Sequence, residues 1–288
     1  MWLRILIPGW IAAAAAAAQM QPTPVSVEPV RGGIYLVRGG SGANTAFIVG
    51  KDEVVAIDAK MSADSARAML AGIAKVTTLP VKHIILTHSD GDHVNGLSGF
   101  PKGITIVAHA NTKKDMEEAF RDPKLADLAA YLPSEVVTQD RLLELPGIKL
   151  RLLYFGPAHT SGDLVVYLPE QKVAIIGDLA FVGRDPLIHR QKGGTSFGLI
   201  QVLRKISALD ADTFLTGHSD PLTKADLEKL AASIGEKQSK VKALIEQGKT
   251  LDEIKAALGV TDTAGSKGVR RPSFIEVIYQ ELSTPQRP

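Results

Sequence analysis

The chain contains no cysteine among its 288 residues. This absence excludes disulfide bonds, thiolate metal ligands and cysteine nucleophiles, so any metal must be held by histidine and carboxylate side chains. An excess of charge of one sign is also lacking, because 33 Lys and Arg residues against 31 Asp and Glu residues leave a formal net charge of +2. That charge is too small to attract a polyanion strongly, and we expect no nucleic-acid partner.

The apolar run near the N-terminus is too short for a permanent membrane anchor. It covers residues 5–18, follows Arg4 and ends in alanines that offer a small-residue cleavage site near Ala16 and Ala18. Spanning a bilayer takes roughly 20 residues. We predict that residues 1–18 are a signal peptide, that the mature chain begins near Gln19 without stable membrane insertion, and that it is exported to the periplasm or secreted.

Aromatic residues are scarce at 5%, but a hydrophobic content of 45% allows a substantial core. Strand-like apolar runs followed by helical patterns occur twice, before and after about residue 140. This order predicts an α/β fold of two sheets covered by helices. Ser62 is a candidate N-cap for one helix, and 224–242 has the spacing of an amphipathic covering helix. Without a flexible linker between the halves, residues 19–288 are expected to form one domain.

A dense polar cluster follows the apolar run 81–86. It reads His88-Ser89-Asp90-Gly91-Asp92-His93, with two imidazoles and two carboxylates on one short loop. Such a donor set suits Zn²⁺, Fe²⁺ or Mn²⁺, and it carries more charge than a turn requires for solubility. The loop is therefore a candidate metal site.

Three more candidate ligands occur in the second half of the sequence. Each of His159, Asp178 and His218 follows an apolar run and has a glycine nearby. Strand ends on a rigid scaffold can present ligands to a shared cleft, and glycine permits close backbone approach. We expect these side chains to join the first cluster.

This pattern resembles the metallo-β-lactamase superfamily. The family's His-x-His-x-Asp-His motif matches residues 88–93 with one change, and its three later ligands match His159, Asp178 and His218 in order. Further matches occur at residues 44–50, 55–58 and 84–88, so the resemblance covers nearly the whole mature chain. It implies a four-layer αββα sandwich of two mixed β-sheets covered by helices.

The resemblance also implies two divalent metal ions, with zinc expected first. Its first site corresponds to His88, position 90 and His159, and its second to Asp92, His93 and His218, with Asp178 bridging the two. A metal-bound water or hydroxide between the ions would attack the substrate. Asp92 is the candidate catalytic residue, which would orient this nucleophile and deliver a proton to the leaving group.

Asp90 departs from the family motif, which has histidine at this position. An aspartate there either binds the metal directly, binds it through a water or leaves the first site weak. Alternatively, Asp90 is only a turn residue of the loop, and a single metal is bound. If Asp90 ligates, the added negative charge should raise the pKa of bound water and give a more alkaline optimum than in an Asp90→His variant. More oxygen donors also make iron or manganese possible.

Three further residues are candidates for supporting roles. Arg184 and His189 lie in the segment after Asp178 and are assigned to substrate binding. The alternative for Arg184 is a solvated surface side chain, and the alternative for His189 is a contact with a metal ligand rather than with substrate. Asp58 either orients a ligand histidine or caps the next helix.

The favoured function is an exported metal-dependent hydrolase acting on a small ester, lactone, amide or β-lactam-like substrate. One alternative is a di-iron or mono-iron redox enzyme, because flavodiiron proteins place a carboxylate at the position of Asp90. The other is a noncatalytic metal-binding protein. The sequence indicates no oligomeric state.

Overall fold

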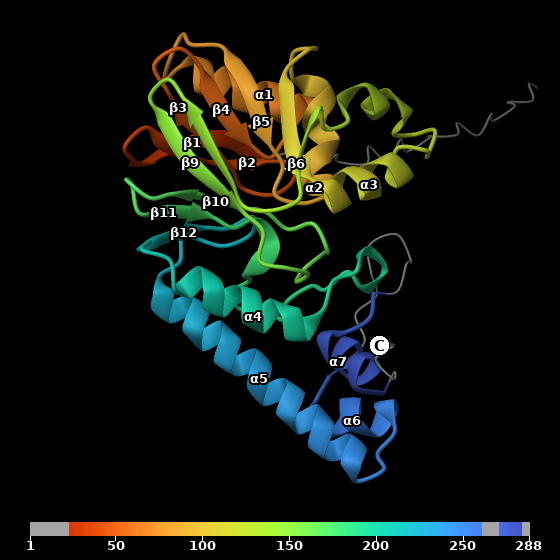
Figure 1. The fold of residues 1–288 in the computed structure, drawn as a ribbon. Helices are drawn as coiled ribbons and strands as arrows, with labels where there is room; N and C mark the ends of the chain where they lie inside the picture. Colours follow the sequence, from red (N-terminus) through yellow and green to blue (C-terminus); the bar gives the residue numbers. More distant parts are fainter. Residues whose placement is uncertain (1–22, 261–270, 284–288) are drawn as a thin grey trace, which may run out of the picture.

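The computed structural model describes residues 23–260 and 271–283. The predicted signal peptide lies outside these ranges. Two β-sheets face each other, with helices on the outer face of each (Figure 1). The predicted four-layer α/β sandwich is therefore confirmed.

The first sheet has seven strands and the second has five. In spatial order the first contains β1 (Thr23–Arg31), β2 (Ile34–Gly40), β3 (Thr45–Val49), β4 (Val54–Ile57), β5 (Val81–Ile85), β6 (Thr105–His109) and β7 (Glu135–Val137). The second contains β12 (Thr213–Leu215), β11 (Val173–Ile175), β10 (Val165–Leu168), β9 (Ile148–Leu153) and β8 (Arg141–Leu145). Both sheets are mixed. In the first, β1 to β4 pair antiparallel and β4 to β7 pair in parallel. In the second, β8 to β11 pair antiparallel and β11 pairs in parallel with β12.

The burial of the strands explains their places. In β9, Ile148, Leu150 and Leu152 are buried while Lys149 and Arg151 are exposed, so one face packs on the core and the other meets solvent. All four residues of β4 are buried, as expected for a central strand covered on both faces. Buried residues of both sheets form the middle core.

Helices cover the outer faces of the two sheets (Figure 1). The helices are α1 (Ala63–Ala74), α2 (Gly91–Val94), α3 (Ala110–Ala119), α4 (Ser196–Ser207), α5 (Lys224–Glu246), α6 (Leu251–Ala257) and α7 (Phe274–Ser283). Short 3₁₀ helices are η1 (Asn95–Gly99), η2 (Ala126–Tyr131), η3 (Gly177–Leu179) and η4 (Arg190–Lys192). One core cluster joins α1 to the first sheet, and another joins α4, α5 and α7 to the second.

Local sequence chemistry fixes the ends of two of these helices. The Ser62 hydroxyl accepts a hydrogen bond from the Ser65 N–H and caps α1, as predicted. Thr223 and Asp226 form a reciprocal capping box at the start of α5, the predicted covering helix. Among the described residues, no helix combines the length and apolar character needed to cross a membrane.

Candidate metal centre

Loops from both sheets bring together all seven metal-ligand candidates. His88, Asp90, Asp92 and His93 follow β5, His159 lies between β9 and β10, Asp178 follows β11, and His218 follows β12. The side chains, together with His189, form three groups, within each of which the ligand atoms lie within 4.8 Å of one another, and the first two groups share His159. The groups are His88, His159 and Asp178; Asp90, His159 and His189; and Asp92, His93 and His218.

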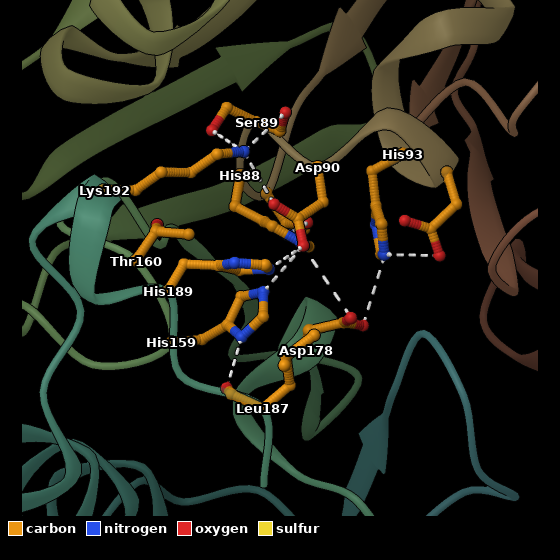
Figure 2. Close-up of polar contacts among 12 residues, drawn as sticks. His88, Ser89, Asp90, His93, His159, Thr160, Asp178, Leu187, His189 and Lys192 are labelled. Atoms are coloured by element: carbon orange, nitrogen blue, oxygen red, sulfur yellow. Dashed lines mark hydrogen bonds and ion pairs between the residues drawn. The ribbon is translucent and has the colours of Figure 1, made fainter. Parts of the chain in front are cut away.

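Each buried imidazole is oriented by a partner on its Nδ1 atom. His88 Nδ1 lies 3.0 Å from Thr87 Oγ1. His159 Nδ1 lies 2.7 Å from the Leu187 carbonyl oxygen (Figure 2). Because one ring nitrogen is engaged in this way, the Nε2 atoms of both histidines face the shared site.

Asp90 is surrounded by cationic and imidazole groups. Its Oδ2 lies 2.7 Å from His189 Nε2 and 3.2 Å from His159 Nε2, while Oδ1 accepts a hydrogen bond from Lys192 Nζ at 2.7 Å (Figure 2). Burial opposes ionisation, but the hydrogen bonds from His159 and His189 hold the pKa of Asp90 well below its usual range. Asp90 precedes α2 without a side-chain capping bond, so it is not a turn residue that stabilises the helix.

Asp178 lies between the two halves of the site. Its Oδ1 is 3.2 Å from His93 Nε2, whereas Oδ2 is 3.2 Å from His218 Nε2 and 4.0 Å from His88 Nε2. Asp92 Oδ2 is 3.0 Å from His218 Nε2. Asp178 therefore lies near imidazoles of both expected sites, which is compatible with the bridging position that the resemblance implies.

The carboxylates favour protonation of their imidazole neighbours. Although burial has the opposite effect, contacts with Asp90 raise the pKa of His159 to about 9. Contacts with Asp178 and Asp92 likewise raise the pKa of His218 to about 9 against the effect of burial. Metal ions and protons should therefore compete for these nitrogen atoms.

The donor set matches a metal centre in one specific respect. In the described part of the chain, four buried side-chain nitrogen or oxygen atoms have no aligned hydrogen bond, and three of them are His88 Nε2, His93 Nε2 and Asp178 Oδ1. The last two atoms lie 3.2 Å from each other and so make a charge contact. Burying polar atoms without partners costs free energy. Divalent cations bound by imidazole and carboxylate would satisfy all three atoms, so the residues present suit the two-metal site that the resemblance implies.

Asp58 orients the candidate ligand His93, which is one of the two roles that the sequence allowed. It is 2% exposed, and its Oδ2 lies 2.8 Å from His93 Nδ1 and accepts the Thr87 hydroxyl at 2.8 Å. Its Oδ1 accepts the Thr87 N–H. Asp58 thereby fixes the His93 ring and directs Nε2 toward the site.

The loop between β2 and β3 forms one wall of the centre. The Ala43 N–H donates to the Asp92 carbonyl at 3.3 Å, and the Asn44 N–H donates to the Gly217 carbonyl at 2.7 Å. The fully buried Lys60 ammonium donates to the carbonyls of Val37, Gly39 and Ala43. These bonds hold the loop against the ligand segments.

Arg184 lies at the rim of the site and away from the ligands. Its side chain is exposed, and its guanidinium carbon lies 4.3 Å from the centroid of the Phe181 ring. Phe181 in turn stacks on His218, with ring centroids 5.7 Å apart. A cleft of about 530 Å³ includes His218, Val182 and Asn44 in its lining, and one of about 570 Å³ includes Phe181, Val182 and Arg184.

Sequence reasoning missed Lys192 and underrated His189 as a neighbour of the ligands. Both lie in a segment without a metal-binding motif, and they approach Asp90 only because this loop folds back over residues 88–93. The only sequence signal for them is a histidine and a lysine soon after Asp178, the predicted bridging residue.

Comparisons with known proteins identify the family and the fold. A family model described as the metallo-beta-lactamase superfamily matches residues 38–218. The chain is 28% identical over 207 residues to the 2,4-dinitroanisole O-demethylase subunit alpha of Nocardioides sp.. This alignment covers 71% of the chain and 60% of the relative. It is 25% identical over 179 residues to metallo-beta-lactamase IND-1 of Chryseobacterium indologenes, which covers 59% of this chain and 71% of that protein.

Solved structures show the same fold. The stereoselective inverting sec-alkylsulfatase Pisa1 from Pseudomonas sp. superposes with a TM-score of 0.72 at 19% identity, covering 89% of this chain and 50% of the alkylsulfatase. The chain thus spans 60% of the O-demethylase subunit and half of the alkylsulfatase.

Proposed function

The chain belongs to the metallo-beta-lactamase superfamily, and we propose that it is an exported metal-dependent hydrolase. Its substrate would be a small ester, lactone, amide or β-lactam-like molecule. The observation that carries this proposal is the convergence of three buried atoms without an aligned hydrogen bond, His88 Nε2, His93 Nε2 and Asp178 Oδ1, among imidazoles and carboxylates. Divalent cations bound there would lower the pKa of a water molecule and polarise the scissile group.

The protein's own groups position the reactants around such a centre. Asp92 Oδ2 lies beside His218 Nε2, and the Asp92 side chain is 23% exposed, so its carboxylate is accessible from solvent. Burial disfavours its ionisation, but the hydrogen bond with His218 and the nearby His93 lower the pKa of Asp92. Asp92 is therefore ionised at neutral pH and can accept a proton from attacking water and return it to a leaving group.

The metal we propose first is zinc, two ions per chain, because five imidazoles and three carboxylates lie around the centre. The carboxylates of Asp90, Asp92 and Asp178 also suit iron or manganese. A purified protein holding two irons and consuming oxygen without hydrolysis would favour the redox alternative.

The substrate space consists of the two clefts beside His218 and Phe181. Both are open and include charged side chains, among them Arg38 and Arg184. We propose that Arg184 binds an anionic group of the substrate. An Arg184→Ala variant should then raise KM for an anionic substrate while leaving kcat and the KM for a neutral analogue unchanged.

The proposed activity is tested with the purified mature chain loaded with zinc or manganese. Lactam, lactone, aryl ester, sulfate ester and phosphodiester substrates are assayed in parallel for the parent chain, Asp92→Ala and the control Asp64→Ala. Asp64 is an exposed carboxylate in the first turn of α1. Turnover lost in Asp92→Ala and retained in the control supports the proposal. No turnover on any class, or turnover indifferent to Asp92→Ala, overturns it.

Export rests on Arg4 and the apolar residues 5–18. Expression of the full chain in a bacterial host should yield a periplasmic or extracellular protein whose N-terminus lies near Gln19. An uncleaved cytoplasmic product would contradict the export part of the proposal without affecting the hydrolase part.

A further inference from the structure

We propose that His189 is a metal ligand, completing a first site made of His88, His159, His189 and Asp90. In this arrangement His189 supplies the imidazole that position 90 lacks, and Lys192 holds Asp90 in place. The proposal rests on the metal binding proposed above and assigns to His189 a role different from the substrate contact expected from the sequence.

The carboxylate oxygen of Asp90 lies amid three imidazole nitrogens. Asp90 Oδ2 is 2.7 Å from His189 Nε2, 3.2 Å from His159 Nε2 and 3.8 Å from His88 Nε2 (Figure 2). The three rings come from different segments of the chain, and His159 is shared by the two groups of candidate ligands that contain His88 and His189. Three imidazoles and one carboxylate arranged in this way are a four-ligand donor set for a divalent transition metal.

The backbone holds His189 beside His159. The His189 N–H donates to the His159 carbonyl at 2.9 Å, and the N–H groups of Lys192 and Gly194 donate to the His189 carbonyl, each at 2.9 Å. Gly193 has a φ of 72°, which allows this tight return of the chain. The two imidazoles are thus fixed relative to each other by main-chain bonds, as a preorganised ligand pair should be.

Lys192 occupies one of the two carboxylate oxygens of Asp90. Its Nζ donates to Asp90 Oδ1 at 2.7 Å, to the Ser89 carbonyl at 3.2 Å and to the Ser89 hydroxyl at 3.1 Å. Asp90 Oδ2 alone therefore faces the imidazoles. The ammonium also offsets the negative charge that aspartate brings to the site, so replacing histidine by Asp90 does not leave an extra uncompensated charge beside the metals.

The position of His189 argues against a direct substrate contact. Its Nε2 points at Asp90, its side chain is only 14% exposed, and neither of the clefts beside His218 and Phe181 has it in its lining. The carboxamide of Gln191 contacts the other ring nitrogen, Nδ1, at 3.0 Å. A histidine that binds a metal through one ring nitrogen usually has a hydrogen-bond partner on the other.

Metal titration of the mature chain tests this assignment without relying on activity. Chelator-stripped protein is titrated with Zn²⁺ against a chromophoric chelator and with Co²⁺ while visible absorption is recorded. The variants are His189→Ala, the milder His189→Gln, and the control His83→Gln, whose histidine pairs with Glu53 away from the site. Circular dichroism and urea midpoints of the metal-free proteins establish that each variant is folded.

We expect the parent chain and the control to bind two equivalents. Loss of an outer partner of a ligand weakens metal binding by about 10- to 100-fold, so loss of the ligand itself in His189→Ala should weaken one site by about 100-fold or more. Its Co²⁺ spectrum should change for that site alone. Adding Asp90→His to His189→Ala restores an imidazole and should recover the second equivalent.

Two equivalents in folded His189→Ala, with affinities and Co²⁺ spectrum equal to those of the parent, would overturn the assignment. So would failure of Asp90→His to restore the lost site. Loss of one site in His189→Ala from a parent that hydrolyses nothing would support the ligand assignment and reject only the hydrolase, so the two proposals fail separately.

Discussion

Replacing Asp58 by asparagine changes one atom at the centre of the ligand scaffold. Asp58 has a φ of 62°, in the left-handed region that asparagine also tolerates, so the backbone should not be strained. The new amide can still accept the Thr87 N–H through its oxygen. Its NH₂ group, however, would face His93 Nδ1, from which the carboxylate now accepts a hydrogen bond at 2.8 Å.

The consequence for metal binding follows from the tautomer of His93. With an NH₂ donor beside it, Nδ1 must become an acceptor, and the proton moves to Nε2, the atom that faces Asp178. A hydrogen bond to a charged group contributes about 1.5 to 3 kcal/mol. At about 1.4 kcal/mol per tenfold change, this corresponds to roughly 10- to 100-fold weaker metal binding at the second site.

The assay is competition for Zn²⁺ between the stripped protein and a chromophoric chelator at pH 7.5. Nitrogen NMR of the metal-free protein should show His93 protonated on both nitrogens in the parent chain, where Asp178 and Asp58 raise the pKa of this ring well above its usual range against the effect of burial. In Asp58→Asn the ring should be protonated on Nε2 alone. The matched control, Asp64→Asn, makes the same chemical change on an exposed carboxylate. Unchanged zinc affinity at both sites, or an unchanged protonation state of His93, would refute the reasoning.

Three further substitutions test other features of the fold. Burial lowers the pKa of Lys60 to about 8, despite the nearby Asp58, so the unfolded chain binds more protons between pH 8 and 10.5. Because of this group, the free energy of unfolding should rise over that range by up to about 1.4 kcal/mol per pH unit. Urea titrations of Lys60→Met should show a smaller rise with pH. Equal slopes of unfolding free energy against pH in the two proteins would contradict this. A Cβ at Gly217 would lie 2.8 Å from His93 Cε1 and against the Asp178 carboxylate, so Gly217→Ala should lose at least one metal equivalent by elemental analysis, and full retention would contradict the close packing. Glu281, in α7, accepts a hydrogen bond from the Ser196 N–H at the start of α4. Glu281→Ala should therefore lower the free energy of unfolding by about 1 to 3 kcal/mol. An unchanged urea midpoint would mean that water replaces this hydrogen bond.

Much of the centre could be predicted because its residues follow strands. The apolar run before His88 predicted a buried strand, and β5 ends just before it. Asp178 and His218 follow β11 and β12, which are parallel neighbours, so their ends bring both side chains to one place. Short-range pattern and the geometry of a parallel pair were sufficient for these ligands.

The sequence left open the role of Asp58, because a residue just after a strand can either cap a helix or orient a ligand. The structure places its carboxylate on His93 and Thr87, while Ser62 caps α1. The pairing register of β4 with β5 decides the role of Asp58, because it sets which side chains meet in the loops that follow these two strands.

By itself the amino-acid sequence determined the α/β sandwich, the seven candidate ligands and the absence of any thiolate donor. These properties depend on residue type, hydrophobic periodicity and position relative to strands, all of which are local. Tertiary structure alone decided the surroundings of Asp90, because Lys192 is 102 positions away and His189 is 99 positions away. Contacts at that separation depend on how the loop after η3 returns across the facing sheets, and no local pattern encodes the path of that loop.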